Sequence, residues 1–356
     1  MTMAFLSESR VQSAQVRRYA VGRNDWIGGL LALALLTALL TAMPTARAAD
    51  TKSEVTDPDS IALLARIQAA ARQLDYTGVF TYAQGDFTQS SRLVHIVDGT
   101  GSRERLEVLD GEPREFIRHN DDVQCLMPER KKILIERRRT DRFPGLLLGD
   151  PAGLSGNYVV HVRAGKQRVA GRECRVVTIE PRDTKRYGYK LCADIDTNLL
   201  LKAQTLSGDH TLIEQVMFTS LRVGGTIAPE SLQSSWSTQG WSVVKPEMNP
   251  VDLAAKGWRV PPPEGFIPVM QIERVMGQSE QVGQIVFSDG LAAISVFIEP
   301  YDTRGTLQKK QGAARHGAIN VFGTRIADFW LTALGEVPVS TLQQLAESTE
   351  YVPLPK

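Results

Sequence analysis

The 356-residue chain has little of the side-chain chemistry that most catalytic and metal sites require. It contains only three cysteines, which argues against a small disulfide-rich scaffold. Its five histidines lie apart, and none pairs with another at the spacing of zinc ligands. The sequence has no G-x-S-x-G motif, phosphate-binding loop or dinucleotide-binding fingerprint. We therefore expect a protein that is not an enzyme and that holds no metal and no organic cofactor.

An excess of charge of one sign is also missing, because 41 basic side chains stand against 40 acidic ones. A protein that binds nucleic-acid phosphates would carry an excess of lysine and arginine, so we expect no nucleic-acid partner. The hydrophobic fraction of 42% is that of an ordinary globular protein. At this length one hydrophobic core is too small to organise the whole chain, and two domains are expected.

The first 48 residues have the layout of a secretory signal peptide. Four arginines between residues 10 and 23 precede an uncharged run of 21 residues, Trp26 to Ala46, which leads into Ala46-Arg47-Ala48. The run is also long enough for an uncleaved membrane anchor. Pro44 and the small-x-small triplet favour cleavage after Ala48 instead. We therefore expect a signal peptide at residues 1–48 and an exported mature chain.

Export makes Cys174 and Cys192 candidates for a disulfide. They lie in two strand-like runs, residues 172–179 and 186–193, on either side of a turn centred on Asp183. If the strands pair about this centre, the two cysteines face each other directly. A bond between cysteines 18 residues apart would stabilise the fold by about 3 kcal/mol on the loop-entropy model. Two buried thiols are the alternative, and Cys125 is expected to be a small core residue.

The chain after residue 57 begins as a helix and then changes to the alternation of β-strands. Pro58 suits the first helical turn, and apolar residues recur at helical spacing as far as Leu74. From Tyr76 onward short strands are separated by turns rich in Gly, Asp and Asn. The expected strands are 78–83, 92–97, 103–109, 114–119, 123–127, 132–136, 158–163, 167–170, 172–179, 186–193, 199–206 and 210–221. The pattern predicts an α+β fold with a large curved antiparallel half-barrel at residues 49–221, whose concave face one helix need not fill.

Residues 222–250 are a composition break rich in Gly, Ser, Gln, Thr and Pro, which predicts a connector. Trp236 and Trp241 within it indicate that it packs against something. A smaller α+β domain is expected at residues 251–356, with one hairpin turning at Ser288-Asp289-Gly290 and another turning at Gly323. A short helix from Pro338 to Ser348 would close it.

A cluster of positive charge next to an apolar segment is the most unusual local feature. Residues 129–142 hold 7 basic and 3 acidic groups, whereas the chain without residues 1–48 has 36 basic and 38 acidic groups. Such a cationic edge suits an amphiphile with phosphate groups and acyl chains. The predicted phosphate contacts are Arg137, Arg138, Arg139 and Arg142, and the predicted acyl-chain contacts are Leu146, Leu147 and Leu148. The alternative is a solvated strand end followed by a loop tucked into the core.

A series of short motifs runs through nearly the whole mature chain. The motifs are Tyr76-Thr77-Gly78-Val79-Phe80-Thr81-Tyr82, the hairpin from Arg103 to Glu115, Tyr187-Gly188-Tyr189-Lys190-Leu191, Trp258-Arg259-Val260-Pro261, Pro263-x-Gly265-Phe266, Phe287-Ser288-Asp289-Gly290-Leu291 and Ser295-Val296-Phe297-Ile298-Glu299. In this order they resemble the RseB/MucB family, which regulates the envelope-stress sigma factor of Gram-negative bacteria.

The resemblance implies a periplasmic regulator that is not an enzyme. Its larger domain would resemble the half-barrel of lipoprotein carriers such as LolA, which shelter acyl chains on the concave face. Its smaller domain would help to bind the periplasmic region of a membrane-anchored anti-sigma factor of the RseA/MucA type. Binding would shield that partner from site-1 proteolysis, and lipopolysaccharide or mislocalised lipoprotein would displace the regulator.

Two other functions stay open at this point. A periplasmic lipid or lipoprotein carrier of the LolA type would need only the first domain, and the second domain argues against it. A hydrolase whose catalytic groups assemble only in space is the other alternative. The sequence leaves open whether the protein forms a homo-oligomer.

Overall fold

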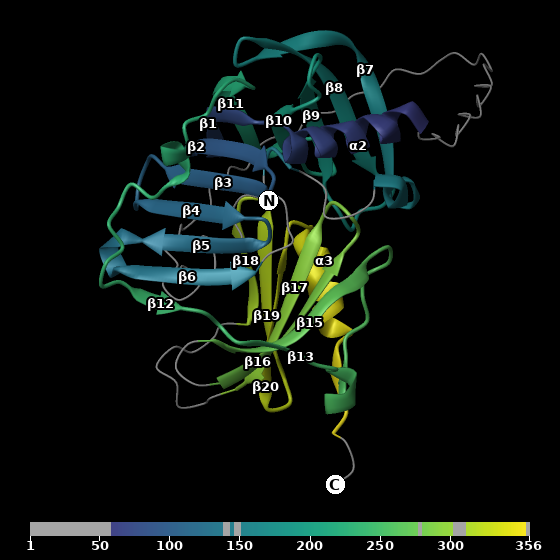
Figure 1. Ribbon diagram of the computed structural model, residues 1–356. Helices are drawn as coiled ribbons and strands as arrows, with labels where there is room; N and C mark the ends of the chain where they lie inside the picture. The colour runs from purple at the N-terminus through teal and green to yellow at the C-terminus, as the bar shows by residue number, and fades with distance from the viewer. Residues whose placement is uncertain (1–57, 138–142, 146–150, 277–279, 302–310, 354–356) are drawn as a thin grey trace, which may run out of the picture. The chain divides into compact units, whose positions relative to one another are not determined.

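The computed structural model describes residues 58–137, 143–145, 151–276, 280–301 and 311–353. These residues all belong to one compact unit, and the predicted signal peptide, residues 1–48, lies outside them. Two large sheets and two α-helices account for most of the described chain, as Figure 1 shows. The predicted α+β class, with a large curved sheet followed by a smaller one, is confirmed.

Twelve strands form the first sheet. They are β1 (Tyr76–Gln84), β2 (Phe87–Asp98), β3 (Gly101–Val108), β4 (Arg114–His119), β5 (Asp122–Met127), β6 (Lys132–Arg137), β7 (Tyr158–Val169), β8 (Arg172–Pro181), β9 (Gly188–Asp194), β10 (Leu200–Leu206), β11 (Leu212–Val223) and β12 (Ser242–Val244). Their spatial order is β12-β6-β5-β4-β3-β2-β1-β11-β10-β9-β8-β7, and every neighbouring pair is antiparallel except β12 and β6. The sheet is curved in Figure 1 but open, because β12 and β7 at its ends do not pair with each other.

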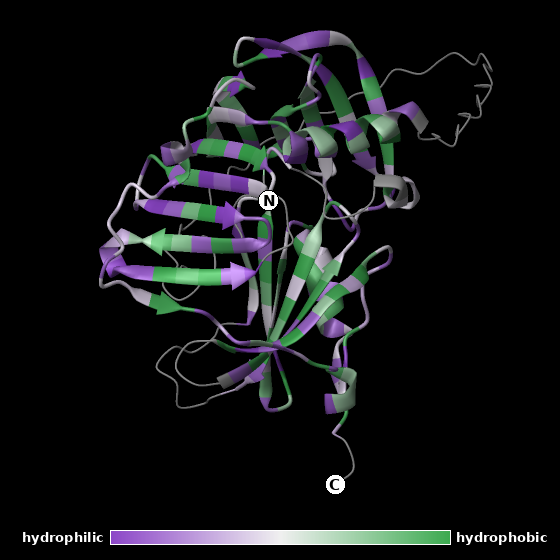
Figure 2. Ribbon diagram, viewed as in Figure 1, coloured by the Kyte–Doolittle hydropathy of each residue, from purple (hydrophilic) through white to green (hydrophobic). Residues whose placement is uncertain are grey.

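Burial alternates along β1 because successive side chains point to opposite faces of a sheet. In β1 the buried residues are Tyr76, Gly78, Phe80 and Tyr82, and the residues between them are half-buried. Figure 2 shows hydrophobic and hydrophilic residues mixed along β2 to β6. The period-two pattern that predicted the strands therefore reflects a sheet with one strongly buried face.

One helix, α2 (Pro58–Gln73), covers that face. It lies against β2, β7 and β10 and buries Leu63, Leu64 and Ile67. The hydroxyl of Tyr76 donates a hydrogen bond to the carbonyl oxygen of Ala71 at 3.1 Å, so the first strand is anchored to the helix that precedes it. With 16 residues α2 is the longest helix in the described ranges, and no helix there is long and apolar enough to span a bilayer.

The structure contains the predicted disulfide between Cys174 and Cys192, with 5.4 Å between their Cα atoms. The predicted register of the hairpin is wrong by two residues, however. Cys174 lies opposite Asp194, and Cys192 lies opposite Val176, so the bond joins diagonal neighbours. The strand β9 begins at Gly188 instead of Arg186, because the side chain of Arg186 is held in the loop by hydrogen bonds to other residues.

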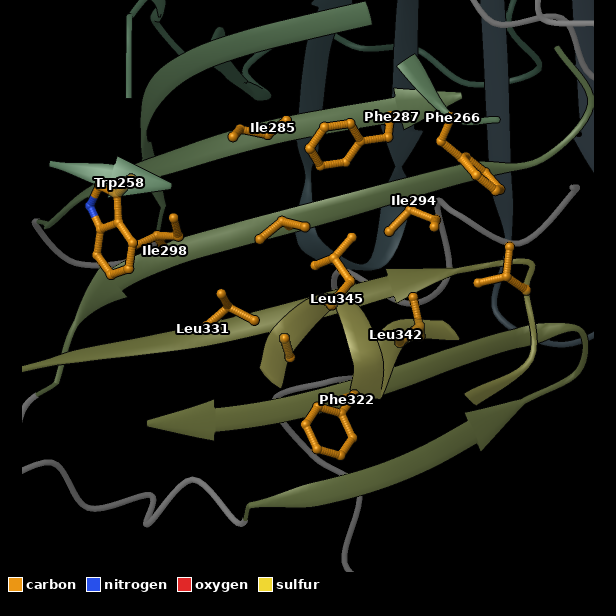
Figure 3. Packing of buried hydrophobic residues seen from close by; sticks show 14 of the residues in the cluster. Trp258, Phe266, Ile285, Phe287, Ile294, Ile298, Phe322, Leu331, Leu342 and Leu345 are labelled. Carbon is orange, nitrogen blue, oxygen red and sulfur yellow. The ribbon is translucent and has the colours of Figure 1, made fainter. Parts of the chain in front are cut away.

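The second sheet has seven strands in the order β13-β15-β16-β17-β20-β19-β18. They are β13 (Met248–Pro250), β15 (Ile267–Met276), β16 (Glu280–Ser288), β17 (Ala293–Pro300), β18 (Gly312–His316), β19 (Ile319–Ile326) and β20 (Phe329–Gly335). The helix α3 (Val339–Glu347) lies against β19 and β20, and its Leu342 and Leu345 point into the sheet core with Phe287 and Leu331 in Figure 3. The predicted closing helix is thus confirmed to within one residue at each end.

Short elements complete the described chain. They are the pair β14 (Trp258–Arg259) with β21 (Glu350–Tyr351), and the 3-10 helices η1 (Pro128–Arg130), η2 (Pro151–Gly156), η3 (Pro229–Leu232) and η4 (Ala254–Lys256). The β14–β21 pair joins the start of the second half of the chain to its end.

The predicted turn at Gly323 is wrong. The strand β19 continues through Gly323 to Ile326, and the turn lies at Ala327 and Asp328. A side chain at position 323 would come within 2.8 Å of the ring of Trp330 on the neighbouring strand. Glycine therefore stands here to make room for an aromatic ring, which is a different reason from the turn that the sequence suggested.

The connector, residues 222–250, lies against the sheet surface in part. Its strand β12 pairs with β6 of the first sheet, and β13 pairs with β15 of the second. Leu232 of η3 is buried beside β3. The rings of Trp236 and Trp241 stack 6.4 Å apart, which agrees with the prediction that these residues pack.

A buried ion pair fixes the connector to β3 and β4. Arg105 donates hydrogen bonds to Glu115 and to the hydroxyl oxygen of Ser235, and the backbone N–H of Ser235 donates to Glu115. Burial alone raises the pKa of a carboxyl group, but hydrogen bonds from Arg105 and Ser235 outweigh it and hold the pKa of Glu115 below its ordinary value. The carboxylate is therefore charged at neutral pH, as the buried guanidinium requires.

Reduction of the disulfide is expected to lower the free energy of unfolding by about 3 kcal/mol, because the reduced chain regains the entropy of an open loop. Urea unfolding of the wild type with and without dithiothreitol measures this difference. The variant Cys174→Ala/Cys192→Ala is the control, since reductant must leave its midpoint unchanged. Equal midpoints for the oxidised and reduced wild type would contradict the prediction.

Candidate functional site

The predicted phosphate-contact segment begins at the end of β6. Arg137 is the last residue of this strand, lies opposite Asp122 of β5 and is exposed. The strand keeps its register with β5 up to Arg137, so it ends there without a bulge. The other predicted contacts, Arg138, Arg139 and Arg142 for phosphate and Leu146, Leu147 and Leu148 for acyl chains, lie outside the described residues.

The apolar segment after the arginines begins in the core of the first sheet. Phe143, Pro144 and Gly145 are buried. The ring of Phe143 lies 5.4 Å from that of Phe80 and 5.0 Å from that of Phe218, on the face that α2 covers. For residues 143–145 the structure thus favours the loop tucked into the core. The concave face is filled here by an aromatic cluster as well as by the helix.

The residue before Arg137 connects the first sheet to the second. Glu136 is buried, and its carboxylate lies 3.9 Å from the guanidinium of Arg274 on β15. Arg274 is buried too and lies over the ring of Phe297, 5.5 Å from its centroid. A buried carboxylate requires a cation or hydrogen-bond donors nearby. Glu136 therefore couples the end of β6 to the second sheet, one residue away from the predicted phosphate contacts.

A fully buried arginine makes several contacts that join the two sheets. Arg186, in the loop between β8 and β9, donates hydrogen bonds to Asp289 at 3.0 Å, to the backbone oxygen of Glu264 at 2.6 Å and to Asp183 at 3.1 Å. Its guanidinium also lies 5.0 Å from the ring centroid of Phe266. Three acceptors and an aromatic face replace the water that this cation loses on burial.

Hydrogen bonds within its own turn orient the Asp289 carboxylate toward Arg186. One carboxylate oxygen accepts hydrogen bonds from the backbone N–H groups of Leu291 and Ala292, and the other accepts from Arg186 and from the hydroxyl of Tyr158 at 2.8 Å. Burial, together with the negative charge of Asp289, raises the pKa of Tyr158 well above its ordinary value. Tyr158 therefore stays protonated and keeps donating.

Further hydrogen bonds join β1 and β11 of the first sheet to the turn before β19 and to β19 itself. Tyr82 donates to the carboxylate of Glu214 at 2.8 Å, and the backbone N–H of Ala318 donates to the same oxygen at 3.0 Å. The side-chain amide of Asn320 donates to the hydroxyl of Tyr187 at 2.8 Å. Burial and the neighbouring Glu214 raise the pKa of Tyr82, so this hydroxyl also remains a donor. The contacts between the two sheets are thus polar, and the groups that make them have hydrogen-bond partners.

Sequence reasoning did not identify these residues. The sequence pattern predicted the turn at Ser288-Asp289-Gly290. It gave no sign of the bond between Asp289 and Arg186, because Arg186 lies 103 residues away in the sequence. Arg186 was placed in a strand. Within the part of the chain that the structure describes, no group of three or more His, Cys, Asp or Glu side chains is arranged to hold a metal ion.

Comparisons with known proteins agree over both halves of the chain. The MucB/RseB N-terminal domain family matches residues 59–236, and the MucB/RseB C-terminal domain family matches residues 252–350. The sigma factor AlgU regulatory protein MucB of Pseudomonas aeruginosa is 30% identical over 324 residues, which cover 89% of this chain and 96% of that protein. The sigma-E factor regulatory protein RseB of Escherichia coli K12 is 25% identical and covers 83% of this chain and 91% of that protein.

Two solved structures are also similar to this chain. A complex of Pseudomonas aeruginosa MucA and MucB matches with a TM-score of 0.65 at 28% sequence identity, and the match covers 83% of this chain and 100% of the chain in the complex. A crystal structure of MucB matches with a TM-score of 0.60 at 28% identity, and the match covers 83% of this chain and 99% of the MucB chain.

Removing one partner of the Arg186–Asp289 pair is expected to lower the free energy of unfolding by about 3 kcal/mol or more, because the other charge stays buried after losing this partner. We expect this for both Arg186→Met and Asp289→Asn, measured by urea unfolding. The double variant should lose less than the sum of the two single losses. Glu264→Gln, which breaks only the exposed ion pair with Lys185, is the control and should cost less than about 1 kcal/mol. Strictly additive losses would show that the pair is not coupled.

Proposed function

Because the chain belongs to the MucB/RseB family, we propose that it is a periplasmic negative regulator of an envelope-stress sigma factor. In this proposal it binds the periplasmic region of a membrane-anchored anti-sigma factor and shields it from site-1 proteolysis. The observation that carries the proposal is the span of the similarity, which covers 89% of the chain and includes both sheets. A lipid carrier would need only the first sheet.

The proposed division of labour follows the two sheets. Residues 49–221 would sense lipid, residues 251–356 would bind the anti-sigma factor, and residues 222–250 would connect them. The connector contributes β12 to one sheet and β13 to the other, which supports a connecting role. Cleavage of the signal peptide after Ala48 is part of the proposal, because the mature protein must reach the compartment in which its partner lies.

Lipopolysaccharide or mislocalised lipoprotein would release the regulator by linkage. A ligand shifts an equilibrium only by its different affinity for two states, and the antagonism between lipid and anti-sigma factor must then be reciprocal. The proposed phosphate contacts are Arg137, Arg138, Arg139 and Arg142, with Leu146, Leu147 and Leu148 near the acyl chains. Lipid bound at these residues would favour the state of the protein that releases the anti-sigma factor.

The ion pair between Glu136 and Arg274 supports this coupling physically. It joins the strand that ends at Arg137 to β15 of the second sheet. Loss of one partner of a buried pair costs about 3–5 kcal/mol, whereas allosteric coupling typically requires about 1–3 kcal/mol. A ligand that repositions the end of β6 would therefore act on a contact strong enough to change the second sheet.

Binding of the partner is the first prediction of the proposal. Titration of the purified protein with the periplasmic segment of the host's anti-sigma factor should give saturable binding, which purified lipopolysaccharide weakens. Isothermal titration calorimetry with and without lipopolysaccharide measures both effects. Lipid binding without any anti-sigma binding would leave a carrier and contradict the regulator.

The placement of the phosphate contacts is tested separately. Replacement of Arg137, Arg138, Arg139 and Arg142 by Ser should weaken lipid-driven release at least about tenfold, because charge-assisted contacts are lost. Affinity for the anti-sigma segment should stay unchanged. A matched control replaces four exposed arginines elsewhere in the first domain by Ser, namely Arg66, Arg92, Arg103 and Arg163. If release is unchanged in the first variant, or falls equally in the control, the placement is wrong.

A further inference from the structure

The connector lies over a row of buried side chains on the first sheet. Glu115 of β4 lies opposite Leu126 of β5, and Leu126 lies opposite Ile133 of β6. Residues directly opposite each other on paired strands share one face of the sheet. The three residues are 0%, 1% and 9% exposed, and the next member of the row, opposite Ile133, is Val243 of the connector.

This row is on the face that α2 does not cover. Phe116, which follows Glu115 in β4, belongs to a row that runs through β3 and β2 to Gly78 of β1. Gly78 and Tyr76 point to the same side of β1, and Tyr76 is bonded to α2. Glu115 and its partners therefore point away from α2, and the connector is what covers them.

We call residues 228–244 the strap, since they run from η3 beside β3 to β12, which Figure 1 shows beside β6. All residues of the strap are described, and among them only Leu232 is buried. Trp236 and Trp241 are half-buried, and Val243 is 58% exposed. A segment with so few buried apolar contacts opens at a lower free energy than the core beneath it.

Polar contacts latch the strap to the sheet, but the charged members of the latch belong to the sheet. The backbone N–H of Ser235 donates to Glu115 at 3.1 Å, and its hydroxyl oxygen accepts a hydrogen bond from Arg105 at 2.6 Å. Arg105 and Glu115 also bond each other, and Glu107 lies 3.3 Å from the same guanidinium. When the strap lifts, the ion pair stays together and water replaces the serine. Opening therefore leaves no charge buried without a partner.

Residues that can change conformation lie at both ends of the strap. Gly224 and Gly225 precede it with φ angles of +73° and +79°, and apart from their chain neighbours no atom lies within 4 Å of the place that a Cβ would take. Glycine adopts such angles without strain, and hinge residues absorb large changes of φ and ψ. The N–H of Gly224 is fixed by a hydrogen bond to the carbonyl oxygen of Asp75 at 2.7 Å, so bending begins after it. At the other end, residues 245–247 separate β12 from β13 and are exposed or half-buried.

The two halves of the strap are joined to each other. The rings of Trp236 and Trp241 stack 6.4 Å apart, and the N–H of Trp241 donates to the carbonyl oxygen of Thr238 at 3.1 Å. One half carries Leu232 and Ser235, and the other carries β12. Because the stacked rings hold the halves together, a loss of contact in one half is passed to the other.

We propose that the strap is a cover that lifts from the outer face of the first sheet as one unit while both sheets stay folded. Lifting breaks the three residue pairs between β12 and β6 and uncovers the side chains of Leu126 and Ile133. The first sheet therefore has a closed form and an open form, and the open form presents the edge of β6 beside an apolar surface. This switch depends neither on the proposed regulatory function nor on the arginines that follow β6.

Hydrogen exchange of the full chain, resolved by residue, tests the proposal. The informative backbone N–H groups are those of residues 235 and 242, which donate to Glu115 and to Lys131 of the first sheet. Their exchange rates should not depend on urea below the unfolding transition, because lifting exposes little surface, whereas the rates in β3 and β4 should rise with urea. Leu232→Ala should raise the rates at both positions at least about tenfold, because the strap loses its buried side chain. Ser235→Ala should raise them about threefold, because Arg105 loses an acceptor.

Two matched controls truncate exposed side chains of the same strap. Val243→Ala and Ser237→Ala should each change the rates at positions 235 and 242 by less than about twofold, since neither side chain is buried. Equal responses of both positions to Leu232→Ala support lifting as one unit. The proposal is overturned if the two rates rise with urea as steeply as those in β3 and β4, if only position 235 responds to Leu232→Ala, or if the controls raise the rates as much as the other variants.

Discussion

A large antiparallel sheet must bury at least one of its two faces, and this constraint organises the first half of the chain. One helix of 16 residues covers the inner face together with Phe143 and its aromatic neighbours. On the outer face, Leu232 and Ser235 of the connector cover part of β3 and β4 through the buried Arg105–Glu115 pair. The segment that joins the two sheets is therefore also a covering layer, so its position depends on the state of the first sheet.

The joint between the two sheets is held by polar contacts. Apolar side chains form the core of each sheet, but the contacts that join the sheets centre on Arg186, Asp289, Glu136 and Arg274. Replacing such pairs by apolar residues often raises stability, so buried ion pairs contribute more to a defined geometry than to net free energy. A joint of this kind suits a protein that must hold one arrangement and still release it when a charged ligand competes for its partners.

The sequence predicted several strands closely, and β4 begins and ends at the predicted residues. It failed where a distant side chain decides the backbone. Arg186 leaves its strand because its acceptors include Asp289, and Gly323 stays in a strand because Trp330 lies over it. The disulfide pairing survived a register error because diagonal cysteines also approach closely enough to bond. The contacts between the sheets could not be predicted, since their partners lie far apart in the sequence, 138 residues in the case of Glu136 and Arg274.

The short strand β12 has a consequence for the solubility of the protein. An uncovered edge strand offers a row of free backbone groups to any other extended chain, and proteins usually hide such edges. Here the three residues Ser242–Val244 pair in parallel with Lys132–Leu134 and occupy half of β6. The connector thereby protects β6 from edge-to-edge aggregation, and a protease cut in the connector before β12 would be expected to free this edge and create a self-associating fragment.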